Sequence, residues 1–154
     1  MAINPSRPVF RAGLVIGIGM GGFVDGIVLH QIFQVHSMLS ARVPNESMAH
    51  MRTNMTADGL FHAADWLFVL AGIALLFRAN RPGVGWSGRA LAGGLIAGWG
   101  VFNVVEGLID HHLLVLHHVV ERLGASAWDW LFLAASTGLI AIGFAIGRRA
   151  TGVR

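Results

Sequence analysis

The sequence predicts an all-α membrane protein with four transmembrane helices. These form a pseudo-two-fold parallel repeat of two helix pairs, with helices one and three projecting into the periplasm. Three observations lead to this prediction: an apolar composition, four long apolar segments, and motifs that occur twice. Hydrophobic residues make up 55 % of the 154 residues and charged residues only 12 %, and the mean hydropathy is +0.64. Because a soluble domain has about 25 % charged residues, this composition indicates a chain that lies in lipid.

The apolar segments are long enough to cross a bilayer, which takes about 20 residues in a helix. They lie near residues 9–35, 60–77, 90–116 and 127–147. Arg7 and Arg11 are followed by the apolar stretch "AGLVIGIGMGG", as basic residues precede the apolar part of a signal peptide. No small-residue cleavage site follows, so we expect a retained first helix.

A motif of the first segment returns in the third. "DGIVLHQIFQVHSM" (25–38) aligns with "EGLIDHHLLVLHHV" (106–119). The alignment matches ionisable residues as well as apolar ones, and these are less easily matched by chance. The matched pairs are Asp25 with Glu106, His30 with His111, and His36 with His117.

A second motif links the second and fourth segments. "DWLFVLAG", beginning at Asp65, aligns with "DWLFLAAS", beginning at Asp129. The two copies, approximately 10–78 and 90–148, each contain two helices, so both face the same way in the membrane. We therefore expect a single transmembrane domain over 1–154 in which helices one and three meet near the axis.

Glycines spaced four residues apart predict close contact between helices in lipid, because small residues let two backbones approach. They include Gly13, Gly17 and Gly21 in the first segment and Gly94 and Gly98 in the third.

Arginine sets the expected orientation, because the chain has no lysine. One side has Arg7, Arg11, Arg78, Arg81, Arg89, Arg148, Arg149 and Arg154, and the other has Arg42, Arg52 and Arg122. The positive-inside rule then puts both termini and the 78–89 loop in the cytoplasm. It puts the loops near 41–56 and 119–126 in the periplasm, so the expected location is a bacterial inner membrane. The pI of 11.3 follows from these flanking arginines, and we expect no nucleic-acid partner.

Polar residues inside the segments fall on narrow helical faces at about 100° per residue. Ionisable groups at membrane depth are rare and mark function by default. The face on helix three contains Asn103, Glu106, Asp110 and His117, and the face on helix two contains Asn54, Asp58, His62 and Asp65.

Histidines and carboxylates on facing helices of a bundle are the usual components of a buried metal site. Mixed imidazole and carboxylate ligands suit Zn or non-haem Fe, and imidazole also suits Cu. The chain has no cysteine, which excludes thiolate ligands. The methionines around His50 are soft ligands that favour Cu(I), so we favour Cu or Zn, with Fe and a bis-histidine haem as alternatives. The candidate ligands are His36, His62, His117 and Glu106, followed by Asp58, Asp110, His30, His111 and His118.

Three functions therefore stay open. The first is a metal-binding protein that handles copper or zinc. The second is a membrane oxidoreductase with a non-haem iron or haem centre, and the third is a proton or ion conduit through Asp25 and Glu106. The chain has no H-E-x-x-H motif, no phosphate-binding glycine loop and no nucleophile elbow, so no enzyme class is assigned.

Three blocks of the sequence resemble a known family: "GGFVDGIVLHQIFQVHSMLS", "NMTADGLFHAADW" and "FNVVEGLIDHHLLVLHHV". They are similar to the signature blocks of a bacterial membrane-protein family known as domain of unknown function 2243. The resemblance implies a small four-helix membrane protein without an established activity. An association of relatives with cytochrome-oxidase assembly factors would suit a copper role and make such a factor a partner, while self-association stays open. Relatives have His-His-Met where this chain has His36, Ser37 and Met38, so we expect no ligand at position 37.

Overall fold

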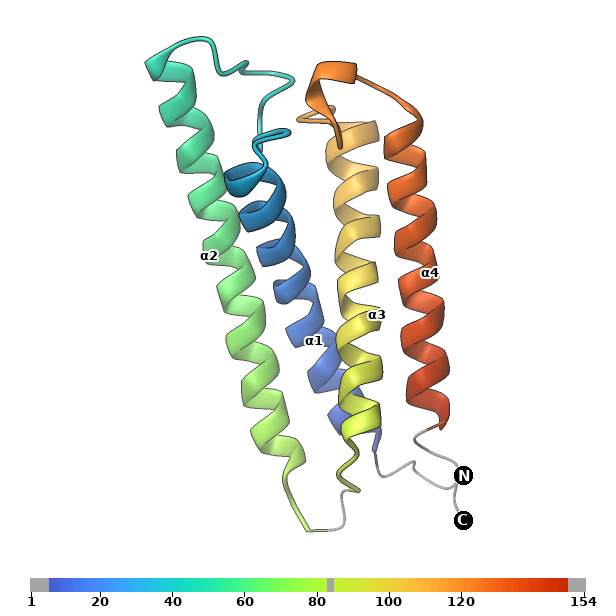
Figure 1. Ribbon diagram of the computed structural model, residues 1–154. Helices are drawn as coiled ribbons and strands as arrows, with labels where there is room; N and C mark the ends of the chain where they lie inside the picture. The colour runs from blue at the N-terminus through green and yellow to red at the C-terminus, as the bar shows by residue number, and fades with distance from the viewer. Residues whose placement is uncertain (1–5, 83–84, 150–154) are drawn as a thin grey trace.

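A computed structural model describes residues 6–82 and 85–149, and this part of the chain contains helices and no strands. Figure 1 shows a bundle of four long helices. They are α1 (Arg7–Val24), α2 (Met48–Ala79), α3 (Gly88–Glu106) and α4 (Ala127–Arg149). A π-helical segment, η1 (Asp25–Ile32), continues α1, and a second, η2 (Gly107–Leu113), continues α3, while η3 (Glu121–Leu123) is a short 3₁₀ turn. All four helices are long and apolar enough to cross a membrane, which confirms the predicted fold class at this level.

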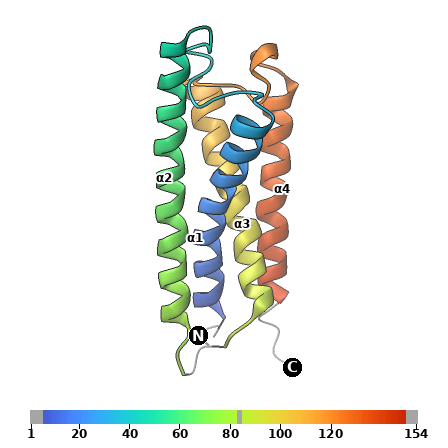
Figure 2. The same ribbon diagram turned by 60° about the vertical axis from the view of Figure 1, so that its left-hand side comes forward.

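The two central helices of the bundle are α1 and α3, and α2 packs against α1 while α4 packs against α3. The start of α1, the end of α2, the start of α3 and the end of α4 all lie at one end of the bundle (Figures 1 and 2). The arginines of these helix ends gather there, whereas Arg154 lies outside the described residues.

Glycine allows α1 and α3 to touch backbone to backbone, as the spacing of four predicts. A methyl group on any of four glycines would collide with the backbone of the opposite helix. Gly13 and Gly17 face Leu91 and Leu95, and Gly94 and Gly98 face Phe10 and Leu14. Leu91 follows Phe10 by 81 positions, and Leu95 follows Leu14 by the same interval. The two sides of the interface therefore make matching contacts.

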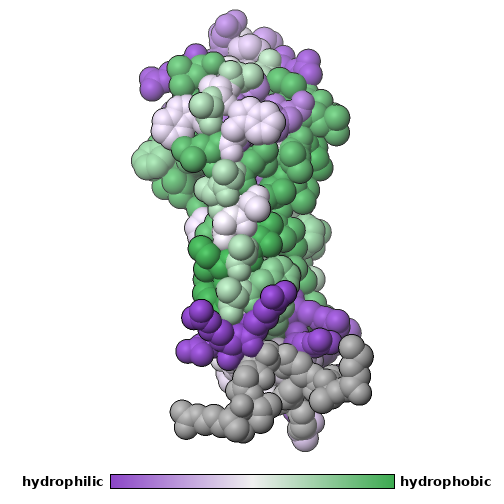
Figure 3. All heavy atoms as spheres, turned by 90° about the vertical axis from the view of Figure 1, so that its right-hand side faces the viewer, coloured by the Kyte–Doolittle hydropathy of each residue, from purple (hydrophilic) through white to green (hydrophobic). Residues whose placement is uncertain are grey.

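The distribution of side chains is the reverse of that in a soluble bundle. Among the described residues, the fully buried apolar side chains are small: Val9, Ala12, Ala79, Ala90 and Ala97. Large apolar side chains point outward, and Phe77 and Leu67 are 75 % and 62 % exposed. Figure 3 shows an apolar band between two polar ends. Such a surface suits lipid, because packing between membrane helices relies on small residues rather than on burial of large ones.

That helices one and three project into the periplasm stays a prediction, and the structure shows where their helical conformation ends. Their helical conformation ends at Ile32 and Leu113, and α2 rises above them (Figures 1 and 2). Shortly after each end, Gln34 and Val115 have positive φ angles of 52° and 50°. That conformation turns the chain back toward the bundle, although neither glycine nor proline marks these positions in the sequence.

The second helix is longer than its apolar segment predicts. It begins at Met48, where the side chain of Ser47 accepts a hydrogen bond from the backbone N–H of His50. Such a cap satisfies one of the free donors of the first turn. The polar first turns of α2 therefore form an extension beyond the apolar band.

Candidate metal centre

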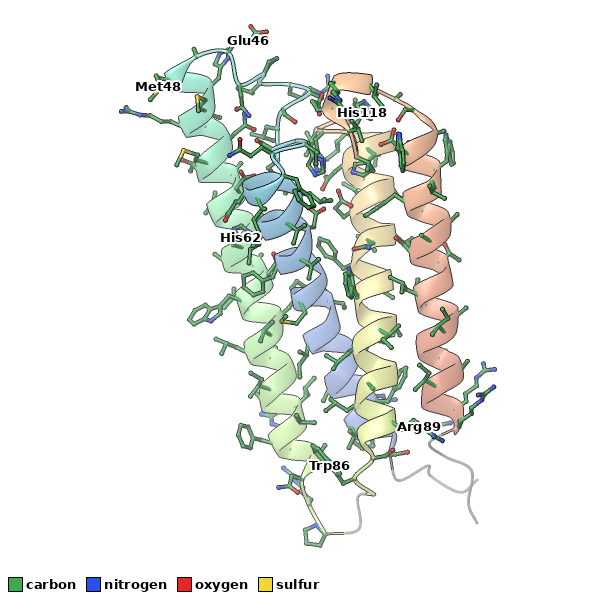
Figure 4. The ribbon with its side chains drawn as sticks, in the orientation of Figure 1. Glu46, Met48, His62, Trp86, Arg89 and His118 are labelled. Carbon is green, nitrogen blue, oxygen red and sulfur yellow. The ribbon has the colours of Figure 1, made fainter. Side chains whose placement is uncertain are left out.

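Six ionisable side chains meet inside the bundle at the end opposite the start of α1 and the end of α4, and we call them the inner cluster. They are Asp25, His30 and His36 from the first half of the chain, and Glu106, His111 and His117 from the second. Their exposed fractions are 6 % or less, and His117 is fully buried. In Figure 4, the neighbouring His118 lies near this end and Arg89 near the other.

The π-helical segments place each acid beside a histidine five residues later. In an α-helix, five residues rotate by about 140° from one another, which would put Asp25 and His30 on different faces. In a π-helix the hydrogen bonds join residues i and i+5, so these side chains lie on one face. The same holds for Glu106 and His111, since η1 begins at Asp25 and η2 directly after Glu106.

In the first half, Asp25 approaches two imidazoles. Its Oδ2 lies 3.1 Å from Nε2 of His30, and its Oδ1 lies 4.0 Å from Nε2 of His36. The other nitrogen of His30, Nδ1, donates to Oδ1 of Asp58 at 2.9 Å. The Nδ1 of His36 donates to the carbonyl of Val119 at 3.0 Å. Both histidines are thus held by a hydrogen bond at Nδ1, and their Nε2 atoms are the ones that lie near the other groups of the cluster.

In the second half, Glu106 has the corresponding place. Its Oε1 lies 3.0 Å from Nε2 of His111 and 3.4 Å from Nε2 of His117. The Nδ1 of His111 lies 3.5 Å from Oδ1 of Asp129. The Asp129 carboxylate also accepts backbone N–H groups of Val119 and of Ser126, at the start of α4.

Asp58 makes the contacts in the first half that Asp129 makes in the second. Asp58 accepts the backbone N–H of Met38 at 3.0 Å, and Met38 lies 81 positions before Val119. The sequence motif pairs Asp65 with Asp129 instead, and Asp65 lies seven residues, or about two helical turns, further along α2. The carboxylate of Asp65 packs against Gly22. The residue that matches Asp129 by its contacts, Asp58, therefore lies about two turns of α2 before the residue that matches it by sequence motif, Asp65.

The imidazole rings of the inner cluster pack closely. The rings of His36 and His117 are stacked with centroids 4.5 Å apart. His30 lies edge-on to His36 at 4.6 Å, and His111 lies edge-on to His117 at 4.9 Å. Burial lowers the pKa of His36 to about 4, and burial together with the neighbouring histidines also lowers the pKa of His117. Both rings are therefore neutral at pH 7, which is the form that binds metal.

Although the acids and imidazoles of the inner cluster lie within ion-pair distance of one another, many of their buried polar atoms make no hydrogen bond of good geometry. They are Nε2 of His30, His36 and His111, both ring nitrogens of His117, Nδ1 of His111, Oδ2 of Asp25 and both oxygens of Glu106. An unsatisfied buried group costs about 1–3 kcal/mol, so this many in one place is costly unless they bind something. Among the described residues, donor atoms within 4.8 Å of one another form two groups that could hold a metal ion: His30, His36 and His117, and Glu106, His111 and His117.

Several predicted ligands lie beside these groups rather than in them. Asp58 holds His30 as described above, and Nδ1 of His118 lies 3.5 Å from Asp129. Asp110 is buried but belongs to neither group. His62 lies partway down the bundle in Figure 4, with its Nε2 against Gly26.

Two further histidines lie apart from the inner cluster. His50 is exposed, and His112 stacks on Trp130 with ring centroids 4.6 Å apart. Conversely, Asp25 and Asp129 were not among the predicted ligands. The repeat alignment could have identified Asp25, since its partner Glu106 was chosen.

A pocket of about 600 Å³ opens beside the first half of the inner cluster. Polar residues of the segment after η1 and of the first turns of α2 line it, and it reaches His30, His36 and Asp58. Met51 and Met55 lie on its wall, outside both groups of donors.

The fold and the inner cluster define a class: a small multi-pass membrane protein with a buried histidine and carboxylate cluster. A family model described as a predicted membrane protein, DUF2243, matches residues 12–150. The chain belongs to this family, in agreement with the resemblance of its sequence blocks. Neither the curated proteins nor the solved structures contain a match to the chain.

Proposed function

We propose that this chain is a metal-binding membrane protein that holds a divalent transition-metal ion in the inner cluster. The observation that supports this most is the pair of close groups of buried donor atoms, most of which make no well-formed hydrogen bond. Metal-ligating histidines usually donate their second ring N–H to a carboxylate or carbonyl. His30 and His36 do so, to Asp58 and to Val119.

The donor types favour zinc, with iron and copper as alternatives. Two imidazoles and a carboxylate suit Zn²⁺ or non-haem Fe²⁺. For copper handling linked to respiratory oxidase biogenesis, the support in the structure is Met51 and Met55 in the adjacent pocket. Those thioethers would bind a copper ion in the pocket before it enters the cluster, and they would not be ligands in the cluster itself.

An oxidoreductase is the main alternative, because a two-histidine, one-carboxylate site with open positions is typical of non-haem iron enzymes. The pocket beside His30 would admit a small substrate. Haem has less support. A bis-histidine haem needs space for a flat macrocycle between its ligands, whereas the His36 and His117 rings are stacked.

A proton conduit is supported by one observation, the position of Asp65. Its side chain is 2 % exposed, lies within a membrane-spanning helix and has an oxygen without a partner. Together with Asp25 it would extend the polar path below the inner cluster. Proton flux into liposomes that Asp65→Asn abolishes would favour this function, and absence of flux would dismiss it.

We also propose the orientation and the repeat. Arginines at the ends of all four helices support cytoplasmic termini in the inner membrane, which puts the inner cluster at the periplasmic side. The interval of 81 positions at the α1–α3 interface and in the inner cluster supports a parallel repeat. A C-terminal alkaline phosphatase fusion should be inactive, and activity in the periplasm would overturn the orientation.

Elemental analysis of protein purified without a histidine tag tests the proposed function. We expect zinc, iron or copper in stoichiometric amounts in the wild type. The double variant His36→Ala/His117→Ala should lose the metal, whereas His112→Ala should keep it, because the half-buried His112 stacks on Trp130 outside the inner cluster. Equal metal in all three proteins, or none in the wild type, would reduce the cluster to a structural polar core.

A further inference from the structure

We infer that the inner cluster is a dinuclear centre whose two ions are inequivalent. One ion lies in the first half and exchanges with the outside through the pocket, and the other lies enclosed in the second half. The inference rests on the proposed metal binding and adds the number, arrangement and access of the ions.

The distances favour two ions over one. Imidazole and carboxylate ligands bind at about 2.0–2.2 Å, so two ligands of one ion are at most about 4.4 Å apart. The donor atoms form two groups with a limit of 4.8 Å, and they do not merge into one group. A single ion would therefore leave some of these buried donors without a partner.

Each half contains an acid and two histidines, but the close groups of donors differ. Asp25 approaches its two histidines through different oxygens, with Oδ2 3.1 Å from His30 and Oδ1 4.0 Å from His36, and the group that contains these histidines has His117 as its third member. Glu106 approaches both of its histidines through Oε1, at 3.0 and 3.4 Å, and all three residues belong to the second group. Three protein ligands are the usual number for a metal with an open position.

His117 connects the two sets, because it belongs to both groups. Its counterpart His36 uses Nδ1 in a hydrogen bond to Val119, whereas neither buried ring nitrogen of His117 makes a hydrogen bond, and its Nε2 lies 3.4 Å from Oε1 of Glu106. An imidazole can ligate two ions at once, one through each nitrogen, when metal binding displaces its remaining N–H proton to solvent. His117 is therefore the residue on which both ions depend.

Access distinguishes the two ions. The pocket reaches His30 and His36, and its lining contains none of Glu106, His111 and His117. The ring of His111 is covered instead by Phe132 of α4, with centroids 5.5 Å apart. The first ion can thus meet a small ligand or a chelator from the polar end of the bundle, and the second cannot.

The experiment loads metal-free protein in detergent with Zn²⁺ alone and then measures stoichiometry and release to an excess of chelator. We expect two Zn²⁺ per chain, released in a fast and a slow phase of equal amplitude. His30→Gln should remove the fast phase and His111→Gln the slow phase, while His112→Gln keeps both.

The wild-type result alone already decides between the possibilities, even if a variant fails to fold. One Zn²⁺ per chain overturns the dinuclear centre while leaving the proposed function standing. Two ions released in a single phase overturn their inequivalence. No bound metal overturns the proposed function itself.

Discussion

The two halves of this bundle have the same centre in different surroundings. Each half places an acid and two imidazoles together, and each holds one imidazole with a carboxylate from the next helix. Around that centre the halves diverge. In the first half, Gly22 packs against the carboxylate of Asp65 and Gly26 against the ring of His62, whereas Gly107, which corresponds to Gly26, packs against Leu133 and Phe132.

This difference indicates which features the centre requires. The acid, the two histidines and the orienting carboxylate occur in both halves, so they are the components of the site. The pocket reaches the histidines of the first half and none of Glu106, His111 and His117, so we assign it to access from outside. Variants of matched residues in the two halves can break or sharpen this interpretation.

The largest effect is expected from His117, in contrast to its counterpart His36. His117→Ala should remove both ions, because the residue belongs to both groups, whereas His36→Ala should remove only the first. Losing a group that merely orients a ligand typically weakens affinity by 10–100-fold, so losing the ligand should exceed that. Zinc content after dialysis against a mild chelator measures the difference. Equal losses in the two variants would show that His117 is not shared.

Removal of the orienting carboxylates should give the next largest effect. Asp58→Asn and Asp129→Asn should each weaken one ion by about 10–100-fold, because the imidazole loses the acceptor that fixes its tautomer and orientation. Competition with a chromophoric chelator measures both affinities. Asp65→Asn is the matched control and should leave both affinities unchanged. If Asp65→Asn weakened metal binding as much as Asp58→Asn does, Asp65 would be the functional counterpart of Asp129, as the sequence motif suggests.

Substitution of a glycine at the contact between α1 and α3 should lower the free energy of unfolding equally in the two halves. Gly17→Ala and Gly98→Ala each place a methyl group against the opposite backbone and should destabilise the fold by about 1–3 kcal/mol. Gly138→Ala is the control, since nothing lies within 4 Å of its added methyl. Unfolding in mixed micelles measures the three free energies. A clear difference between the first two variants would contradict matched packing.

The smallest effect should come from pH. Burial lowers the pKa of His36 from 6.5 to about 4, so between these values the unfolded chain binds a proton that the folded chain does not. Stability of the metal-free protein should therefore fall as the pH is lowered through this range. Thermal unfolding at pH 7 and pH 5 measures the slope, which His36→Gln should reduce. A slope that stays the same in that variant would assign the pH dependence to other groups.

The sequence alone was sufficient for the four helices, because long apolar segments and glycine spacing reflect what lipid and close packing require. It also matched Asp25, His30 and His36 with Glu106, His111 and His117, because chemically similar side chains at one interval are visible in the letters. It misassigned the way in which those residues meet, since it assumed α-helical rotation throughout. The π-helical bonding after Val24 and Glu106 changes which residues share a face.

Only the tertiary structure decided how His36 and His117 enter the cluster. They follow backbone turns at Gln34 and Val115, and the positive φ of a β-branched valine is a conformation that local preference disfavours. Contacts from the other half hold the chain there, such as the hydrogen bond from His36 to Val119. The choice of Asp58 over Asp65 and the opening of one half alone likewise depend on how helices pack side by side, which no local pattern in the chain encodes.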